Sequence, residues 1–328
     1  IFGDKCLVGG NNMFFAVECF KNDFASEGHS TDKFNNNINR FIIEDIISIK
    51  TIINGTCNYI LTRMSKENLS FSDVLKQAQA NGYAEADPTL DVGGGDSGHK
   101  VAILASLISN GYVPYDKISI EGITSISPDD ISFAHELGYT IKLLGVINKT
   151  ENSSGLDVRV HPAMVKNDHI LASVSDVFNA VLIEGDAVGR ILLYGRGAGE
   201  MPTASAVVSD VVDVARNIIG KTAIRLPMGY YNHDNVVTIS PIDDIVSRYY
   251  LRFTVVDEPG VLASIASFLG EQGISIASVI QKERHSDESV PVIILTHEAQ
   301  EIGLKQALSV IEEMDYICAK TQMIRIEQ

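Results

Sequence analysis

The feature that most constrains the fold is the order of elements near the C-terminal end of the chain. Alternating apolar residues at 251–255 predict a half-buried strand, and apolar residues at helical spacing follow at 262–269. The remaining pattern predicts two strands, a helix and a last strand, at residues 274–280, 290–296, 299–314 and 317–326. This βαββαβ order predicts a ferredoxin-like unit over residues 246–328.

The middle of the chain, residues 49–245, mixes helical and strand patterns. Apolar residues recur at helical spacing in 71–78, with Ser70 or Ser72 as the N-cap and Gly82 at the C-terminal end. A loop is expected at 83–95. Further helices are predicted at 101–108, where the sequence is apolar nearly all round, and at 203–217. Strands are predicted at 118–120, 140–148 and 156–160, and a hairpin is predicted from the strands 181–183 and 188–193. We therefore expect an α+β domain built on a mixed sheet.

Composition excludes several classes of protein. The chain has 26 Lys and Arg against 42 Asp and Glu, a net charge of −16, which weighs against binding nucleic acid or an anionic membrane surface. Its four cysteines include no CxxC pair, which predicts neither a structural zinc site nor a disulfide framework and suits the reducing cytoplasm. No apolar run reaches about 18 residues, so we expect no membrane span, and we see no signal-peptide pattern.

The densest cluster of charged side chains lies between Gly82 and Lys100. It contains one lysine and four carboxylates, namely Glu85, Asp87, Asp91 and Asp96. Asp96 and Lys100 are four residues apart at the start of a helix, so both should lie on one face. The apolar helix that follows should lower the pKa of Lys100 and suit it to proton transfer, while the carboxylates could bind an ammonium group. The alternative is an acidic surface loop with an exposed ion pair; the oxygen spacing does not fit an EF-hand calcium loop.

Two further motifs each allow a binding and a structural interpretation. The glycine-rich segment 195–199 precedes a helix and could bind an anion at free backbone amides, or it could be an ordinary loop. The polar segment that begins at Asn54 could orient a ligand, or Asn54 or Thr56 could simply cap a helix.

Taken together, these motifs closely resemble homoserine dehydrogenase over residues 46–328. The matching positions are 54–64, 78–79, 82–88, Asp91, Asp96, Lys100, 179–181, 195–199 and 202–205. The C-terminal unit, with its Asp257-Glu-Pro-Gly turn, resembles the ACT domain that bacterial members carry. The resemblance implies an α/β architecture with a catalytic substrate and dimerisation domain at 49–245 and a regulatory ACT domain at 246–328.

The resemblance also implies an activity, the interconversion of L-homoserine and L-aspartate 4-semialdehyde with NAD or NADP. This reaction belongs to threonine, methionine and isoleucine biosynthesis. Glu85 and Asp96 match positions that bind the substrate amino acid, and Asp91 matches a further acidic position of the site. Lys100 matches the lysine that transfers the proton to and from the substrate oxygen. Two glycines, Gly82 and Gly197, match positions that contact the cofactor.

The N-terminal segment departs from the family pattern. The family begins with a Rossmann domain that carries GxGxxG, whereas residues 7–12 read Leu-Val-Gly-Gly-Asn-Asn. We therefore expect residues 1–48 to be an incomplete nucleotide-binding domain or fragments of one. The family's second catalytic lysine has no counterpart that we can assign. Two rival functions follow: a non-catalytic amino-acid sensor on an incomplete dehydrogenase scaffold, and a dehydrogenase of a different amino-acid aldehyde.

For the ACT domain, the resemblance implies L-threonine as effector. The turn before the helix, from Asp257 to Gly260, would offer free amides to a carboxylate and a side-chain carboxylate to the ammonium. The strand around Ile276 would face it from a second copy. Pairing of ACT edge strands implies a homodimer or homotetramer, and the alternative is that this domain only dimerises.

Overall fold

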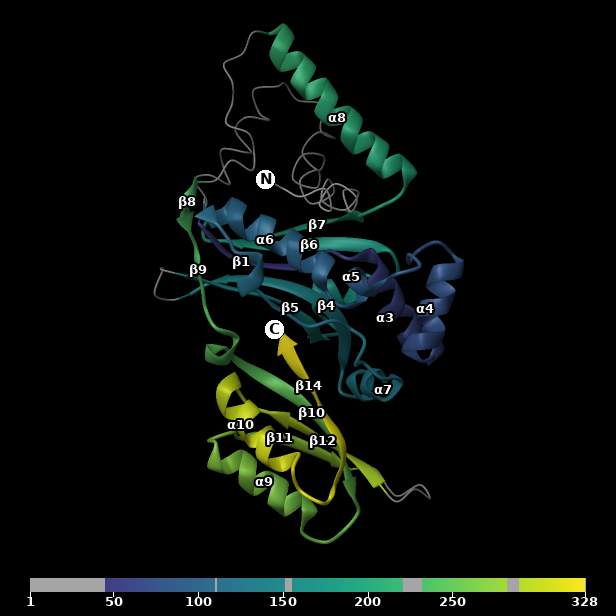
Figure 1. The fold of residues 1–328 in the computed structure, drawn as a ribbon, viewed down its shortest axis with the longest axis vertical. Helices are drawn as coiled ribbons and strands as arrows, with labels where there is room; N and C mark the ends of the chain where they lie inside the picture. Colours follow the sequence, from purple (N-terminus) through teal and green to yellow (C-terminus); the bar gives the residue numbers. More distant parts are fainter. Residues whose placement is uncertain (1–44, 110, 151–154, 221–231, 282–288, 328) are drawn as a thin grey trace. The chain divides into compact units, whose positions relative to one another are not determined.

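The computed structural model describes residues 45–327 except 110, 151–154, 221–231 and 282–288 (Figure 1). The chain divides into two compact units, which are described separately. Unit 1 comprises the residues up to 124, 143–161 and 173–239, and unit 2 comprises 125–142, 162–172 and the residues from 240 onward. The predictions for residues 1–44 lie outside the described residues. No helix of the described ranges has the length and apolar character needed to cross a bilayer.

Unit 1 is built on a mixed sheet, as the sequence predicted, and its strand order is β5-β4-β1-β6-β7. Strand β1 pairs antiparallel with β4 and β6, β6 and β7 form the predicted hairpin, and two short strands, β3 and β9, run parallel to β5. The bounds are β1 Ile46–Ile52, β3 Ser119–Ile120, β4 Tyr139–Lys149, β5 Gly155–Lys166, β6 Phe178–Gly185, β7 Gly189–Arg196 and β9 Thr238–Ile239; a separate pair joins β2 Gly111–Tyr112 to β8 Asn232–Val236. Strand β1 extends into the segment that the sequence assigned to the nucleotide-binding domain.

The helices of unit 1 follow the predicted order, with one correction. They are α3 Gly55–Glu67, α4 Phe71–Ala80, α5 Thr89–Val92, α6 Gly95–Ser109 and α8 Glu200–Ile219, with the 3-10 turn η1 Tyr115–Lys117. Ser70 is the N-cap of α4, so of the two predicted caps, Ser70 and Ser72, the first is correct. The segment at 83–95 is not entirely a loop, because the short helix α5 forms inside it.

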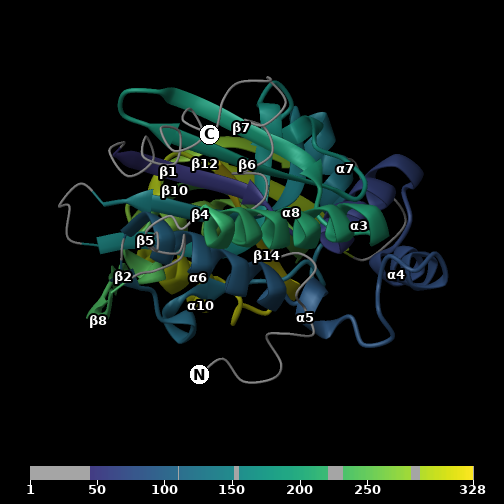
Figure 2. The same ribbon diagram turned by 90° about the horizontal axis from the view of Figure 1, so that it is seen from above.

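Helix α6 is the buried helix of unit 1, and it lies on one face of the sheet (Figures 1 and 2). A glycine makes this close packing possible, because a side chain at Gly145 of β4 would collide with Val101 of α6 and with Thr51 of β1. The packing places the first turn of α6, with Asp96, beside the end of β1 and the start of α3.

Unit 2 contains the predicted βαββαβ arrangement, with the strand order β11-β12-β10-β14. Its elements are β10 Val246–Val256, α9 Val261–Glu271, β11 Ile276–Gln281, β12 Ser289–Thr296, β13 Ala299–Gln300, α10 Glu301–Ile311 and β14 Ile317–Glu327, with 3-10 turns η2 Ile170–Ser173 and η3 Ile242–Asp244. One core unites the two helices with the strands, and it includes Phe253, Ile265 and Leu304, each without measurable exposure. The prediction of a ferredoxin-like unit is therefore confirmed.

Unit 2 also includes residues that the sequence placed in the preceding domain. Helix α7, Pro128–Glu136, begins with a capping box formed by Ser127 and Asp130. The fully buried Asp130 carboxylate accepts hydrogen bonds from Arg252 Nε at 2.6 Å and from the Tyr250 hydroxyl at 3.2 Å, both on β10. Residues 163–165 pair with β14. These contacts join α7 and the end of β5 to the βαββαβ unit.

Candidate active site

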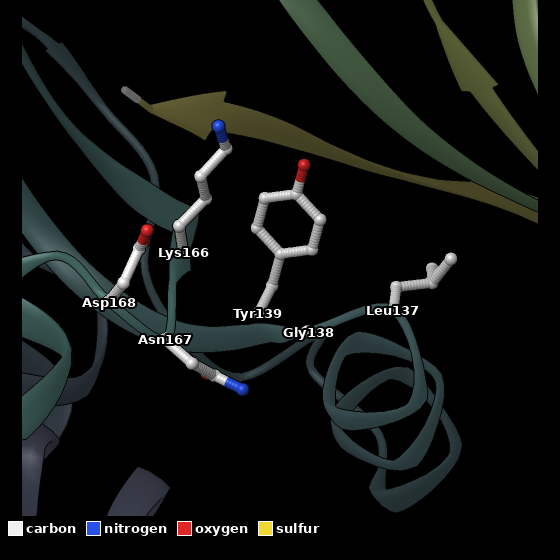
Figure 3. Close-up of a pocket in the computed structure, with 6 residues that line it drawn as sticks. All are labelled: Leu137, Gly138, Tyr139, Lys166, Asn167 and Asp168. Carbon is white, nitrogen blue, oxygen red and sulfur yellow. The ribbon is translucent and has the colours of Figure 1, made fainter.

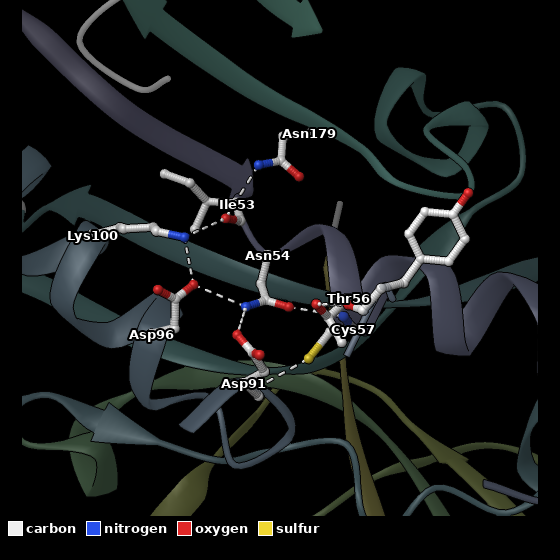
Figure 4. Close-up of polar contacts among 9 residues, drawn as sticks. Ile53, Asn54, Thr56, Cys57, Asp91, Asp96, Lys100 and Asn179 are labelled. Carbon is white, nitrogen blue, oxygen red and sulfur yellow. Dashed lines mark hydrogen bonds and ion pairs between the residues drawn. The ribbon is translucent and has the colours of Figure 1, made fainter. Parts of the chain in front are cut away.

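Asn54 lies at the junction of β1 and α3 and makes three side-chain hydrogen bonds. Its Oδ1 accepts a hydrogen bond from the Cys57 amide at 2.8 Å, so Asn54 is the N-cap of α3. Its Nδ2 donates to Asp91 Oδ1 at 2.7 Å and to Asp96 Oδ2 at 2.9 Å, and Figure 4 shows these groups pointing toward one another. The capping interpretation is therefore correct, and the same side chain also joins two of the predicted site carboxylates.

Lys100 forms a buried ion pair with Asp96. Its Nζ lies 2.5 Å from Asp96 Oδ2 and also donates to the carbonyl oxygen of Ile53 at 3.2 Å. The Lys100 side chain is 4% exposed, so the alternative of an exposed ion pair is wrong. Burial lowers the pKa of Lys100 although Asp96 opposes that shift, as the sequence analysis expected from the apolar helix. A lysine with a lowered pKa can exchange a proton more readily near neutral pH.

Asp91 is half-buried beside this pair. Burial raises the pKa of its carboxyl group, the hydrogen bond from Asn54 opposes the shift, and the negative charges of Asp96 and Glu85 add to it. The buried Cys57 thiol donates to the Asp91 carbonyl oxygen at 3.2 Å, and burial raises the pKa of this thiol. Asp91, Asp96 and Lys100 therefore share one partly dehydrated site.

The predicted glycine-rich loop reaches the same site through Asn179. A side chain at Gly197 would overlap with Asn179 Nδ2, and this nitrogen donates to the Ile53 carbonyl oxygen at 3.3 Å. Lys100 donates to the same oxygen. The Asn179 side chain therefore connects Gly197 to a hydrogen-bond partner of the buried lysine. The loop opens α8, as predicted, with Gly199 as the N-cap at a φ of 126°.

Replacement of Gly197 by alanine should destabilise the protein by about 1–3 kcal/mol, because the new methyl group must displace the fully buried Asn179 side chain. The matched control is Gly270→Ala in α9, where no heavy atom lies within 4 Å of the new Cβ. That control should be neutral, or stabilising by up to about 1 kcal/mol, because alanine favours a helix. Denaturant unfolding measures the stability of both variants. Equal stability would show that the Asn179 side chain does not exclude a methyl group at position 197.

The remaining predicted site residues of this region lie in the turn between α4 and α5. Glu85 is exposed, and its charge acts on Asp91. Gly82 has a left-handed φ of 74°, and no heavy atom lies within 4 Å of the place that a Cβ would occupy. It follows the C-terminal end of α4, as the sequence predicted. The Thr56 hydroxyl donates to the Tyr83 carbonyl oxygen at 2.8 Å, which ties this turn to the start of α3.

In unit 2, the predicted effector residues are not all brought together within one chain. Gly260 is the N-cap of α9 with a φ of 96°, and Asp257 lies half-buried just after β10. Ile276 begins β11 at the edge of the sheet, and β12 separates β11 from β10. Contact between the strand of Ile276 and the turn of a second copy stays a prediction.

Unit 2 also contains a pocket of about 320 Å³ that the sequence analysis did not anticipate (Figure 3). It is lined by Leu137, Gly138, Tyr139, Lys166, Asn167 and Asp168. The Thr140 hydroxyl donates to Asn167 Oδ1 at 2.8 Å, which holds the Asn167 side chain in place. None of the predicted site residues lines this pocket.

The structure adds to the site three groups to which the sequence analysis gave no role, namely the Cys57 thiol, the Ile53 carbonyl oxygen and the Asn179 side chain. Asn179 lies in segment 179–181, one of the segments that match the family, and this match was the signal in the sequence that could have identified it. The carbonyl oxygen of an apolar residue gives no signal in a sequence.

Comparisons with known proteins agree with the resemblance. The family model described as homoserine dehydrogenase matches residues 36–212, and the ACT domain model matches residues 249–315. The homoserine dehydrogenase of Neisseria gonorrhoeae is 45% identical over 284 residues, covering 86% of this chain and 65% of the relative. That of Pseudomonas aeruginosa is 45% identical over 280 residues, covering 84% and 64%.

A solved structure shows the same similarity. The crystal structure of a homoserine dehydrogenase from Thiobacillus denitrificans matches with a TM-score of 0.80 and 39% identity, covering 89% of this chain and 68% of that one. The chain thus spans slightly less than two thirds of the length of these two curated relatives.

Proposed function

Because the chain belongs to the homoserine dehydrogenase family, we propose that the whole protein interconverts L-homoserine and L-aspartate 4-semialdehyde with NAD or NADP. The observation that carries this proposal is the buried Lys100–Asp96 pair, joined through Asn54 to Asp91. Such a reaction would supply threonine, methionine and isoleucine biosynthesis. A cytoplasmic location fits the two described cysteines, Cys57 and Cys318, which are free thiols.

Lys100 is the group that exchanges the proton of the substrate oxygen. In homoserine oxidation its neutral amine accepts the hydroxyl proton, and in the reverse direction its ammonium returns that proton to the new hydroxyl. Burial favours the neutral amine, while Asp96 at 2.5 Å stabilises the ammonium, so both forms are accessible. General acid–base catalysis of this kind typically contributes about 10²–10⁴-fold to a rate.

The carboxylates bind and orient the amino-acid end of the substrate. Glu85 is exposed and Asp91 is half-buried, so their charges can reach a substrate ammonium group. Asp96 contributes to the same negative field while it positions Lys100. A homoserine molecule held by its ammonium would present its hydroxyl carbon at a fixed distance from Lys100, and positioning of this kind lowers the entropic part of the barrier.

The family resemblance assigns the region around Gly197 to the nicotinamide cofactor. Asn179 and Lys100 donate hydrogen bonds to the same carbonyl oxygen, which supports this assignment. The missing side chain at Gly197 leaves the backbone able to approach Asn179 closely beside the lysine, and Gly199 opens a helix N-terminus. Gly197 would contact the cofactor there, and Gly82 would do so from the exposed turn after α4. When bound, the cofactor accepts or donates the hydride, and the protein residues supply position and electrostatics.

The decisive experiment is an assay of the purified full-length protein with L-homoserine and either NAD or NADP, followed by the absorbance of the reduced nicotinamide. Oxidation of L-homoserine in preference to other hydroxylated amino acids supports the proposal. Activity only with a different amino-acid aldehyde would support the second rival function. No turnover with any such substrate, together with binding of an amino acid, would support the non-catalytic sensor.

For the ACT domain we propose regulation by L-threonine in a homodimer or homotetramer. Millimolar L-threonine should release or absorb heat on binding to the full-length protein and should lower the rate about fivefold or more, a typical coupling between two sites. Inhibition requires unequal affinity for two conformations. Calorimetry and steady-state kinetics measure the two effects, with D-threonine as the control. No heat and no change in rate would leave the domain a dimerisation module.

A further inference from the structure

We propose that Asn54 is a positioning residue, which holds the carboxylates of Asp91 and Asp96 in one arrangement beside Lys100. This inference rests on the proposed function, because it assigns a task to a residue within the same site. Asn54 comes from the β1–α3 junction, Asp91 from the short helix α5, and Asp96 and Lys100 from α6. One side chain therefore links three separate elements at the point where the substrate would bind (Figure 4).

The orientation of the Asn54 amide follows from its hydrogen bonds. The Cys57 amide donates to Oδ1 at 2.8 Å, which only an oxygen can accept. The nitrogen must then face the carboxylates, and it donates one hydrogen to Asp91 and the other to Asp96. Both hydrogens of the amide are thereby used. Asn54 is 3% exposed, so water has little access to replace these bonds if they are lost.

Asn54 acts through other residues rather than on the substrate. Lys100 Nζ and Asn54 Nδ2 both donate to Asp96 Oδ2, at 2.5 and 2.9 Å. The same Asn54 nitrogen reaches Asp91 at 2.7 Å, so the amide extends the ion pair to the second carboxylate. Because asparagine carries no charge, it can hold two carboxylates together without neutralising the negative field that would attract an ammonium group.

Without Asn54, the position and charge of Asp91 should both change. Asp91 lies in the short helix α5, and its carboxylate is held by the hydrogen bond from Asn54 Nδ2 at 2.7 Å. The groups that face Asp91 are Asp96 and Lys100 from α6, Cys57 from α3 and Glu85 from the turn before α5. Two of these are carboxylates that repel its charge. The hydrogen bond from Asn54 lowers the pKa of Asp91 against the effect of burial, so its removal should raise that pKa further.

The test is the substitution Asn54→Ser in the full-length protein. A serine hydroxyl can still cap α3 through the Cys57 amide, since serine and asparagine are similar N-caps, but serine cannot reach both carboxylates. We expect KM for L-homoserine to rise about 10–100-fold, the usual effect of losing hydrogen bonds to charged groups, with a smaller effect on kcat. The acidic limb of the kcat/KM profile should move to higher pH, because Asp91 must be ionised to bind the ammonium.

Asn54→Asp is the second variant. It keeps the shape and the capping oxygen but replaces the donor with a third carboxylate, so it should move the acidic limb further than Asn54→Ser does. Thermal melting of each variant shows whether the cap is retained. Asn54→Ala, which lacks both functions, is the control for loss of the cap, and it should melt at a lower temperature than Asn54→Ser.

A titration that does not depend on activity separates this inference from the proposed function. Carbon-13 NMR of labelled aspartate, assigned with Asp91→Asn, measures the pKa of Asp91 directly. A higher pKa in folded Asn54→Ser supports the positioning role even if wild type does not oxidise homoserine, a result that would refute the proposed function alone. Unchanged KM, acidic limb and Asp91 titration in both variants would reduce Asn54 to a helix cap and overturn the inference.

Discussion

Lys100→Ala should lower kcat for homoserine oxidation by about 10²–10⁴-fold while KM changes little. The Lys100 side chain is 4% exposed and forms the buried pair with Asp96. Water that enters the space left by the lysine is a much weaker proton acceptor than an amine, so it should not replace Lys100 in proton transfer. The carboxylates proposed to bind the ammonium remain in this variant, which is why binding should survive.

The matched control is Lys66→Ala in α3, because the Lys66 side chain is 56% exposed and forms a surface ion pair with Asp176. This control should keep its kcat. Small primary amines added to Lys100→Ala should restore part of the rate by entering the space left by the lysine. A Lys100→Ala enzyme with a kcat close to that of wild type would exclude Lys100 as the proton carrier.

The same lysine determines how the two directions depend on pH. Burial lowers the pKa of Lys100, so the neutral amine is populated at a lower pH than for an ordinary lysine. Oxidation requires the neutral amine and should speed up as pH rises through this pKa. Reduction requires the ammonium and should slow down over the same interval. Opposite limbs in the two directions, both lost in Lys100→Ala, identify the group.

Arg325→Ala should lower the free energy of unfolding of unit 2 by about 3–5 kcal/mol. The Arg325 guanidinium donates to Glu301 at 2.6 and 2.7 Å, and the two side chains are 1% and 0% exposed. The Tyr249 hydroxyl donates to the same carboxylate at 3.4 Å. Removing the arginine leaves a carboxylate buried without its main counter-charge, which costs far more than the pair contributes.

Lys305→Ala is the control, because Lys305 contacts the same Glu301 carboxylate at 3.1 Å from a side chain that is 42% exposed. It should cost about 1 kcal/mol or less. The double variant Arg325→Met with Glu301→Gln should recover much of the loss, since no buried charge is left without a partner. Denaturant unfolding followed by a probe in each unit measures all three variants. A loss below about 1 kcal/mol in Arg325→Ala would show that Glu301 is neutralised at little cost.

Local patterns in the sequence were sufficient for much of the fold. The βαββαβ order of unit 2, the hairpin of β6 and β7 and the cap of α4 by Ser70 each depend on residues close together in the chain. Spacing also placed Asp96 and Lys100 on one helix face, because residues four apart in a helix are neighbours. Helix α5 was missed, because four helical residues are too few to produce a periodic signal, and no prediction was made for α7.

The chemical character of the site was decided by the tertiary structure. Asn54 is 42 residues from Asp96 and Asn179 is 126 residues from Ile53, yet each pair is hydrogen-bonded. Likewise, Asp130 of α7 binds Arg252 across 122 residues, which joins α7 to the βαββαβ unit. Spacing along the chain determines which side chains share a helix face or strand face. Which distant groups meet, and whether a lysine that could lie at the surface is instead buried, depends on how those faces pack together.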